Sequence, residues 1–402
     1  MKITDLKCMT ISDLRALIIR IDTDEGISGL AQVEASKYHY LKPHIMFYKT
    51  YLLEQDPTNV ERVMLRIRRF GAFKPWGSSV SAIEMALWDI AGKAASIPVH
   101  KLLGGKIRDR VRIYNGGVRP PMKGVSPEDY AENAREIKKA PEGFTIMKWG
   151  IGFHSRMPSM VPGYYYGEEP LEPNLPYLYL RGHVTEKGLK HTVACVEALK
   201  EELGDEIGLA LDCGPGWTVP AAIRLAKALE PFNVMWLEDL ITGDYTPYTL
   251  PEAYRLVTQS TSTPIHTGEQ VYLRQGFQDL IEKHAVNIIG PDPCDVGGIA
   301  ELKWVAEYAD LHGILIAPHG VFDGPIGLAA LVQASATLPQ NYIAFEYPQI
   351  DPRWYDLVKG LSNLTAKNGY INVPDEPGLG VELDEGAVRK HLKEEETYFD
   401  DA

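Results

Sequence analysis

The sequence is poor in cysteine, and the cysteines that it has stand far apart. Four occur in 402 residues, with no CxxC pair: Cys8, Cys195, Cys213 and Cys294. A disulfide framework or a structural zinc site needs cysteines in closely spaced pairs, so the sequence argues against both. We therefore expect reduced thiols and a cytoplasmic protein.

Positive charge and long apolar runs are also scarce. Lys and Arg number 41 against 54 Asp and Glu, which gives a net charge of −13. This charge would repel phosphate backbones and anionic membranes, so we expect neither nucleic acid nor a membrane as partner. The N-terminus lacks the continuous apolar core of a signal peptide, and no later run would span a bilayer. An acidic protein that handles an anionic small molecule needs local positive charge, from basic side chains or a metal ion.

The N-terminal part contains strand and helix signals. The stretch LRALIIRIDTDEGISGLAQVEA is rich in β-branched residues around DTDEG, which suits a hairpin turn. Residues 78–95, SSVSAIEMALWDIAGKAA, show apolar residues at helical spacing, with Ser81 and Glu84 at the spacing of a capping box. The sequence therefore predicts strands over residues 1–35, followed by a helix that these two residues cap.

From about residue 123, short apolar runs alternate with amphipathic segments for some 250 residues. This alternation predicts an α/β fold with a parallel sheet closed into a barrel. Seven of the runs end on or beside an ionisable residue: Lys148, Asp212, Glu238, Glu269, Asp292, His319 and Glu346. Because the C-terminal ends of barrel strands open on one face, we expect these side chains to converge on a single mouth.

Three carboxylates from successive strands, Asp212, Glu238 and Glu269, would repel one another unless a cation lies among them. Oxygen ligands without His or Cys favour a hard divalent cation, and Mg²⁺ is the cofactor that we predict. Each acid taken singly is more simply interpreted as a strand-end carboxylate paired with a nearby Lys or Arg. The three together favour the metal.

Lys148 comes from an earlier strand and His319 from a later one, so they should face each other across the mouth. Either side chain can act as an acid or a base beside a cation. Asp292 precedes His319 by one βα unit and would fix the tautomer of the imidazole. Each residue also has a simpler interpretation. Lys148 would be a solvated strand-end lysine, His319 a packed core histidine, and Asp292 an N-cap or metal-site acid.

The interval between Lys148 and Asp212 is longer than one βα unit. The insertion at residues 153–189 is rich in Pro, Tyr and Gly and lacks helical periodicity. On the C-terminal side of a barrel strand it would form a lid or a substrate-contacting loop beside the site. An oligomer contact is an equally good interpretation, because tyrosine is also enriched at interfaces.

Four motifs stand out along the chain: DTDEGISGLAQVE, SAIEMALWDIAGKAASIPVHKLLGG, DPCDVGGI and PDEPGLGVELD. Together they resemble the enolase superfamily, in its mandelate racemase and muconate lactonising enzyme branch. The resemblance covers nearly the whole chain. It implies an N-terminal α+β capping domain over 1–122, a modified TIM barrel over 123–370, and a C-terminal segment, 371–402, that returns to the cap.

The resemblance also implies roles for particular residues. Asp212, Glu238 and Glu269 would hold Mg²⁺, Lys148 would be the second-strand acid/base, and Asp292 with His319 would form a catalytic dyad. Substrate contacts would come from Glu346 on the eighth strand, from the cap loops that contain Tyr38 and Trp76, and from Arg274. Family members are commonly dimers or octamers, so we expect a homo-oligomer.

The sequence departs from the family pattern at two positions. The second strand often carries Lys-x-Lys, but its first position here is Ile146. Mannonate and galactonate dehydratases typically place a histidine two residues after the first metal ligand, where this chain has Gly214. The second departure removes the general acid that those two activities would use. The segment APHG…GPIGLAA is nonetheless more similar to sugar-acid dehydratases than to cycloisomerases.

We therefore predict a Mg²⁺-dependent lyase that dehydrates a hydroxylated carboxylic acid, a sugar acid, to a 2-keto-3-deoxy acid. Two alternatives stay open. A racemase or epimerase would use Lys148 and His319 to remove and return one proton. A non-catalytic barrel protein would need neither.

Overall fold

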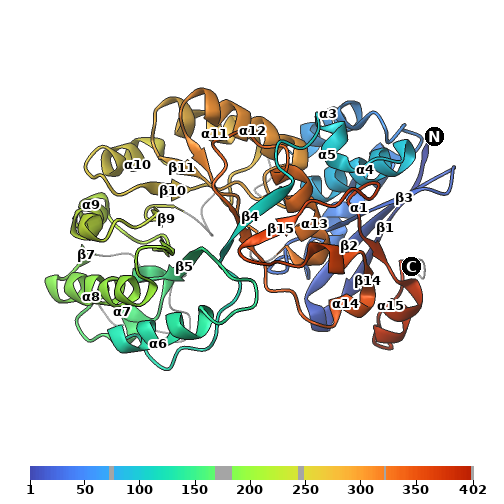
Figure 1. Ribbon diagram of the computed structural model, residues 1–402. Helices are drawn as coiled ribbons and strands as arrows, with labels where there is room; N and C mark the ends of the chain where they lie inside the picture. Colours follow the sequence, from blue (N-terminus) through green and yellow to red (C-terminus); the bar gives the residue numbers. More distant parts are fainter. Residues whose placement is uncertain (72–76, 168–182, 243–248, 321–322, 400–402) are drawn as a thin grey trace.

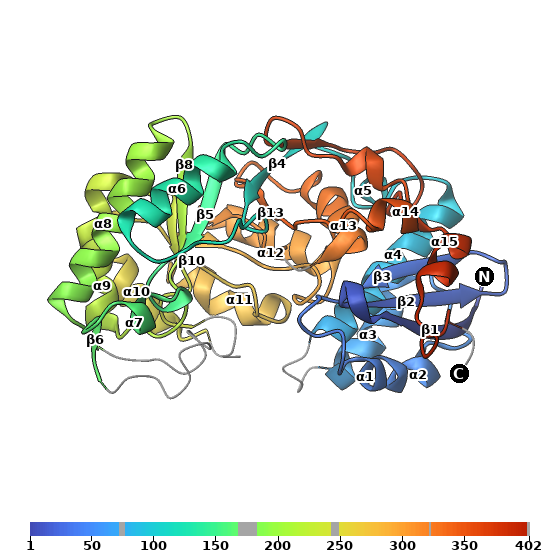
Figure 2. The ribbon, with the colours of Figure 1, turned by 90° about the horizontal axis from the view of Figure 1, so that it is seen from below.

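The computed structural model describes five stretches of the chain, residues 1–71, 77–167, 183–242, 249–320 and 323–399. None of the helices in these stretches is long and apolar enough to cross a membrane. The four cysteines are buried free thiols. Figures 1 and 2 show a small N-terminal part, the cap, beside a larger barrel.

The cap begins with a three-stranded antiparallel sheet in the order β1-β2-β3. Its strands are β1 (Ile3–Ile11), β2 (Ala16–Thr23) and β3 (Ser28–Gln32). The predicted hairpin is confirmed, because β2 pairs with β3 on either side of the DTDEG turn. A 3-10 turn, Ser12–Leu14, joins β1 to β2, and helices follow: α1 (Lys42–Phe47), α2 (Lys49–Leu52), α3 (Val60–Gly71), α4 (Ser78–Ala95) and α5 (Val99–Leu102).

The barrel consists of parallel strands in the order β12-β11-β10-β9-β8-β5-β4-β13. They are β4 (Arg110–Asn115), β5 (Ile146–Gly150), β8 (Gly208–Asp212), β9 (Trp236–Glu238), β10 (Ile265–Thr267), β11 (Ile288–Ile289), β12 (Leu315–Ile316) and β13 (Phe345–Tyr347). A parallel bridge between Ile316 and Tyr342 brings the last two strands together and closes the ring. Since β4 is already a barrel strand, the predicted boundary at residues 122/123 falls inside the barrel.

Helices form the outer layer of the barrel. They are α6 (Pro127–Ile137), α8 (Glu186–Leu203), α9 (Val219–Leu229), α10 (Pro251–Thr258), α11 (Leu273–Glu282), α12 (Ile299–Leu311) and α13 (Gly324–Ser335). Short 3-10 turns lie at Gly152–His154, Glu230–Phe232 and Leu361–Leu364. The barrel interior is filled below the strand ends by a small cluster that includes Tyr114, Ile146 and Trp236. Ile146, the residue in place of the first family lysine, therefore packs beneath the site.

The insertion contains α7 (Met157–Met160) and a small hairpin of β6 (Tyr165–Tyr166) with β7 (His183–Val184). Its residues 168–182 lie outside the described stretches, so both interpretations of it stay predictions.

The C-terminal residues return to the cap, as Figures 1 and 2 show. The elements are α14 (Trp354–Leu357), β14 (Val358–Lys359), β15 (Tyr370–Asn372), β16 (Glu382–Leu383) and α15 (Glu385–His391). β15 pairs antiparallel with β4, and Glu396 accepts the backbone N–H of Ser12 at 2.7 Å. The first contact is with the barrel and the second with the cap, so the segment touches both parts, and its assignment to the cap stays a prediction.

The predicted capping box of α4 is wrong. The helix already begins at Ser78, and Ser81 and Glu84 lie inside it, fully buried. Glu84 accepts the backbone N–H groups of Ile299 at 2.7 Å and Ala300 at 2.9 Å. These N–H groups belong to the first turn of α12 and have no acceptor within that helix. Glu84, on helix α4 of the N-terminal part, therefore supplies the N-terminal hydrogen bonds of a barrel helix. Sequence spacing alone gave no sign of this distant partner.

Glu84→Ala should lower the free energy of unfolding by about 3 kcal/mol, because two buried backbone N–H groups and the partly buried Trp88 indole N–H lose their acceptor. Urea unfolding followed by circular dichroism measures the change. The matched control is Glu136→Ala, which removes an exposed partner of Lys139 and should cost under about 0.5 kcal/mol. Equal effects of the two variants would contradict the assigned role of Glu84.

Candidate active site

Lys148 lies at the mouth of the barrel among carboxylates. Its Nζ is 2.7 Å from Glu238 Oε1, 3.0 Å from Glu346 Oε1 and 3.8 Å from Asp212 Oδ2. Burial alone would lower the pKa of Lys148, but Glu238 and then Glu346 raise it well above its ordinary value. The ammonium in turn lowers the pKa of Glu238 to about 2 against the effect of burial. Lys148 is therefore held as a cation by the acids around it.

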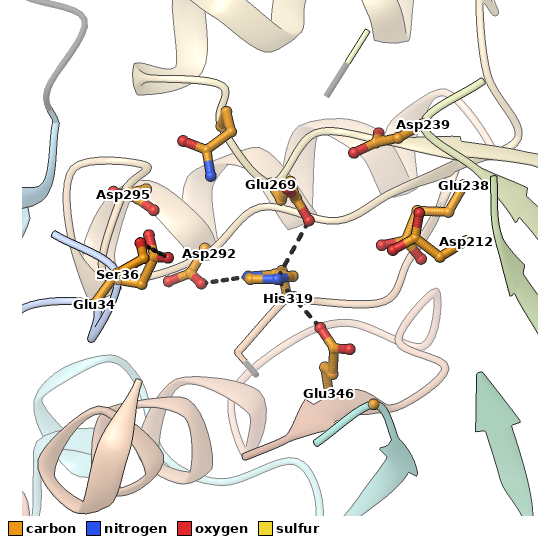
Figure 3. A network of polar contacts seen from close by, with 12 residues as sticks. Glu34, Ser36, Asp212, Glu238, Asp239, Glu269, Asp292, Asp295, His319 and Glu346 are labelled. Carbon is orange, nitrogen blue, oxygen red and sulfur yellow. Dashed lines mark hydrogen bonds and ion pairs between the residues drawn. The ribbon is translucent and has the colours of Figure 1, made fainter. Parts of the chain in front are cut away.

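His319 lies on another side of the same mouth, in the centre of Figure 3. Its Nδ1 is 2.6 Å from Asp292 Oδ2, while its Nε2 is 3.2 Å from Glu269 Oε2 and 3.3 Å from Glu346 Oε2. Burial alone would lower the pKa of His319, but Glu346 and Asp292 raise it to about 10. The predicted pairing of Asp292 with His319 is present, and it leaves Nε2 as the nitrogen that faces the mouth.

The three predicted cation ligands also lie in the mouth. Asp212 and Glu238 end neighbouring strands and are register partners, and Glu269 follows β10. Their exposed fractions are 6%, 1% and 5%. Figure 3 shows Asp212 and Glu238 side by side and Glu269 turned toward His319. Glu238 and Asp212 do have a cationic neighbour, Lys148, but all three acids are buried at one place, so their role as cation ligands stays a prediction.

The donor set fits a hard divalent cation. Buried carboxylates gather in the mouth, among them Asp212, Glu238, Glu269, Asp292 and Glu346. Lys148 and His319 together can balance two of these charges, and every predicted ligand offers only oxygen. In the described stretches, potential ligand atoms that all lie within 4.8 Å of one another belong to a different trio, Asp292, Cys294 and Asp323.

Glu346 connects the two halves of the site. Its Oε1 faces Lys148 and its Oε2 faces His319, and the side chain has no exposed surface. A Cβ atom on Gly116 would collide with Glu346 Oε1, so the glycine on the neighbouring loop makes room for this carboxylate. Lys148 and His319 are thus separated by about the width of one carboxylate group.

The predicted substrate contacts have different outcomes. Tyr38 lies in the cap loop next to Lys37, whose Nζ is 2.6 Å from Asp295 of the barrel, so this loop reaches the mouth. Trp76 lies outside the described stretches. Arg274 is not brought to the site, because it pairs with Glu301 of α12 at 2.5 Å and covers Trp304. Glu301 is 2% exposed and needs a cationic partner there.

His154 is a residue of the site that the sequence did not reveal. Its Nδ1 is 3.3 Å from Asp212 Oδ1. A Cβ on Gly214 would lie 2.7–2.9 Å from the backbone N, Cα and Cβ of His154. The place left by the missing histidine at position 214 is thus filled from the loop after β5. The glycine was the available signal, but its spatial neighbour is 60 positions earlier in the chain.

Both parts of the chain match known families. Residues 3–104 match the family described as Mandelate racemase / muconate lactonizing enzyme, N-terminal domain. Residues 129–387 match the family described as Enolase C-terminal domain-like. The chain belongs to the enolase superfamily. Within this superfamily, the N-terminal match places it in the mandelate racemase and muconate lactonizing enzyme branch, and the fold is the expected modified TIM barrel with a cap.

Relatives of this enolase-superfamily chain carry dehydratase names. A D-xylonate dehydratase of Haloferax volcanii is 34% identical over 400 residues, which are 96% of this chain and 87% of the relative. A D-galactonate dehydratase family member of Pseudarthrobacter chlorophenolicus is 30% identical over 386 residues, 92% of this chain and 90% of the relative. A mandelate racemase/muconate lactonizing enzyme-like structure from Rubrobacter xylanophilus has a TM-score of 0.80 at 32% identity and covers 99% of both chains.

Proposed function

We propose that this protein is a sugar-acid dehydratase that uses Lys148 and His319 on either side of its substrate. The observation that carries the proposal is their separation by a single carboxylate, Glu346, at 3.0 Å and 3.3 Å. A substrate carbon bound in the mouth beside these two groups would have two titratable nitrogens within reach. The dehydratase names of relatives that align over nearly the whole chain support the same reaction class.

The reaction would start with loss of the proton α to the substrate carboxylate, taken by Lys148 or by His319 through Nε2. The electron pair then forms a double bond to the β-carbon as the β-hydroxyl leaves with a proton. His319 is the better donor of that proton, because an imidazolium is more acidic than a lysine ammonium. Water and an enol are formed, and the enol tautomerises to a 2-keto-3-deoxy acid.

Asp212, Glu238 and Glu269 would hold Mg²⁺. Bound there, the cation would supply positive charge that stabilises the negative charge developing on the substrate. It would also weaken the attraction between these carboxylates and the Lys148 ammonium group. Asp292 keeps Nδ1 of His319 occupied, so that proton exchange with substrate is confined to Nε2.

Racemisation or epimerisation is the second candidate, because the same two groups could remove a proton on one face and return it on the other. The reactions differ in their products. With Mg²⁺ and a library of mono- and diacid sugars, dehydration gives a 2-keto-3-deoxy acid, detected by its keto group. Deuterium incorporation from D₂O without loss of water would overturn the dehydratase assignment and favour the epimerase.

His154→Asn tests which imidazole protonates the leaving hydroxyl. Since we assign that step to His319, kcat of the His154 variant should stay within about tenfold of the original protein. Steady-state dehydration and α-proton exchange in D₂O are measured together. A loss of about a thousandfold in dehydration with exchange retained would transfer the acid role to His154.

A further inference from the structure

A buried carboxyl group behind the catalytic dyad is not used by the proposed reaction. Asp323 has no exposed surface, and neither of its carboxyl oxygens has a hydrogen-bond partner among the described residues. One carboxyl oxygen of Asp323 lies within 4.8 Å of one of Asp292 and of the Cys294 thiol. Asp292 is the residue that holds His319 at 2.6 Å. An unpartnered buried acid thus lies directly behind the group that orients the imidazole.

The ordinary role of an aspartate before a helix is not realised here. Asp323 occupies the N-cap position of α13, where Asp normally accepts a backbone N–H of the first turn. Its side chain makes no such bond within the described part of the chain and lies toward Cys294 instead. Gly327, one turn later, leaves room for it, since a Cβ there would lie 2.5 Å from Asp323 Cβ. The Asp323 carboxyl group is therefore buried in the interior, and helix α13 lacks the side-chain hydrogen bond that it would otherwise receive from its N-cap residue.

Two carboxylates this close in a buried place cannot both be ionised, so one of them keeps a proton. Asp292 is the better anion, because it accepts the backbone N–H of Cys294 at 2.6 Å as well as the imidazole. Burial, and next the charge of Asp292, raises the pKa of Asp323 well above its ordinary value. The proton then belongs on Asp323, and its O–H has Asp292 as the nearby acceptor.

A proton explains this trio better than a metal ion does. Burial, the largest cause, raises the pKa of the Cys294 thiol well above its ordinary value, so the sulfur stays protonated. A neutral thiol is a poor ligand for a hard cation, and the thiol already lies 3.7 Å from the backbone oxygen of Gln32. A dication here would also lie behind the imidazole and oppose its protonation.

We propose that Asp323 is a positioning residue whose protonated carboxyl group donates a hydrogen bond to Asp292 and so fixes the imidazole of His319. The chain of contacts runs from Asp323 to Asp292 to His319 Nδ1. The proposal deepens the proposed function and rests on it where turnover is the readout. Its chemistry requires a neutral hydrogen-bond donor at position 323, not a negative charge.

Two substitutions separate these requirements. Asp323→Asn keeps the shape and a donor but cannot be charged, so it should retain at least about a third of the kcat. Asp323→Leu keeps the branching at Cγ but removes the donor, and it should lower kcat about a hundredfold with KM within about twofold of the original protein. The control Cys294→Ala changes another side chain of the same trio without touching the donor, and its kcat should stay within about twofold.

A second readout needs no substrate. In protein labelled with ¹⁵N-histidine, the Nδ1–H signal of His319, assigned by its absence in His319→Asn, should persist in Asp323→Asn and broaden or disappear in Asp323→Leu. If no sugar acid is turned over, the proposed function fails while this measurement still decides the role of Asp323.

Some results would overturn the proposal. One is a loss of activity in Asp323→Asn as large as that in Asp323→Leu, which would show that a charge or a bound cation is needed. Another is an Asp323→Leu protein with unchanged kcat and imidazole signal. If Asp323→Leu does not fold by circular dichroism, Asp323→Asn decides alone, since only a neutral donor role predicts its rescue.

Discussion

Replacing His319 by asparagine should lower kcat by at least about a thousandfold while Mg²⁺ binding is retained. Asparagine can still bond to Asp292, but it carries no titratable nitrogen to face Glu346 and the substrate. The loss should extend to α-proton exchange if His319 is the base, and should spare exchange if it acts only as the acid. Steady-state kinetics measures kcat, deuterium exchange in D₂O measures proton abstraction, and calorimetric titration measures Mg²⁺ binding.

His284→Asn is the matched control. His284 lies after α11, outside the site, at a φ of 48° that asparagine tolerates well. The control should keep its activity. If His319→Asn also kept near-original activity on the true substrate, His319 and Lys148 would not be the acid/base pair.

Glu238→Gln should abolish both Mg²⁺ binding and turnover. The carboxylate lies 2.7 Å from Lys148 and accepts the Trp236 indole N–H at 2.9 Å, so the glutamine removes a charge from the centre of the site. A hard cation depends on anionic oxygen, and we expect its affinity to fall by at least about a hundredfold. Calorimetric titration with Mg²⁺ measures the affinity independently of any substrate.

Glu252→Gln on α10 supplies the control, since Glu252 is largely exposed and pairs with Lys283 at 3.0 Å. It should bind Mg²⁺ as the original protein does. Tight Mg²⁺ binding by Glu238→Gln would place the cation elsewhere, and the trio of Asp292, Cys294 and Asp323 would then be the next site to test.

Much of the site was predictable because parallel barrel strands share one direction. Lys148, Glu238 and Glu346 each end a short apolar run in the sequence, and the structure brings both carboxylates within 3.0 Å of the Lys148 ammonium group. Strand ends of one barrel open on one face, so the local pattern already implied convergence. The same reasoning paired Asp292 with His319.

Predictions that needed a long-range partner were less successful. The spacing of Ser81 and Glu84 is that of a capping box, but their partners are at the start of α12, more than 200 positions away. Arg274 could bind a substrate carboxylate, but in the structure its guanidinium group donates to Glu301 of α12 instead. A short sequence window holds no information on which distant backbone groups are left without partners.

The sequence by itself determined the alternation of strands and helices, the residues at the strand ends and the family. Each of these depends on periodicity and on side-chain type, which are local properties. Only the tertiary structure decided that His154 fills the space beside Gly214, that Gly116 makes room for Glu346, and that Asp323 turns inward from its helix. Those outcomes depend on which atoms compete for the same volume and for the same hydrogen bonds, and that competition exists only once the chain is packed.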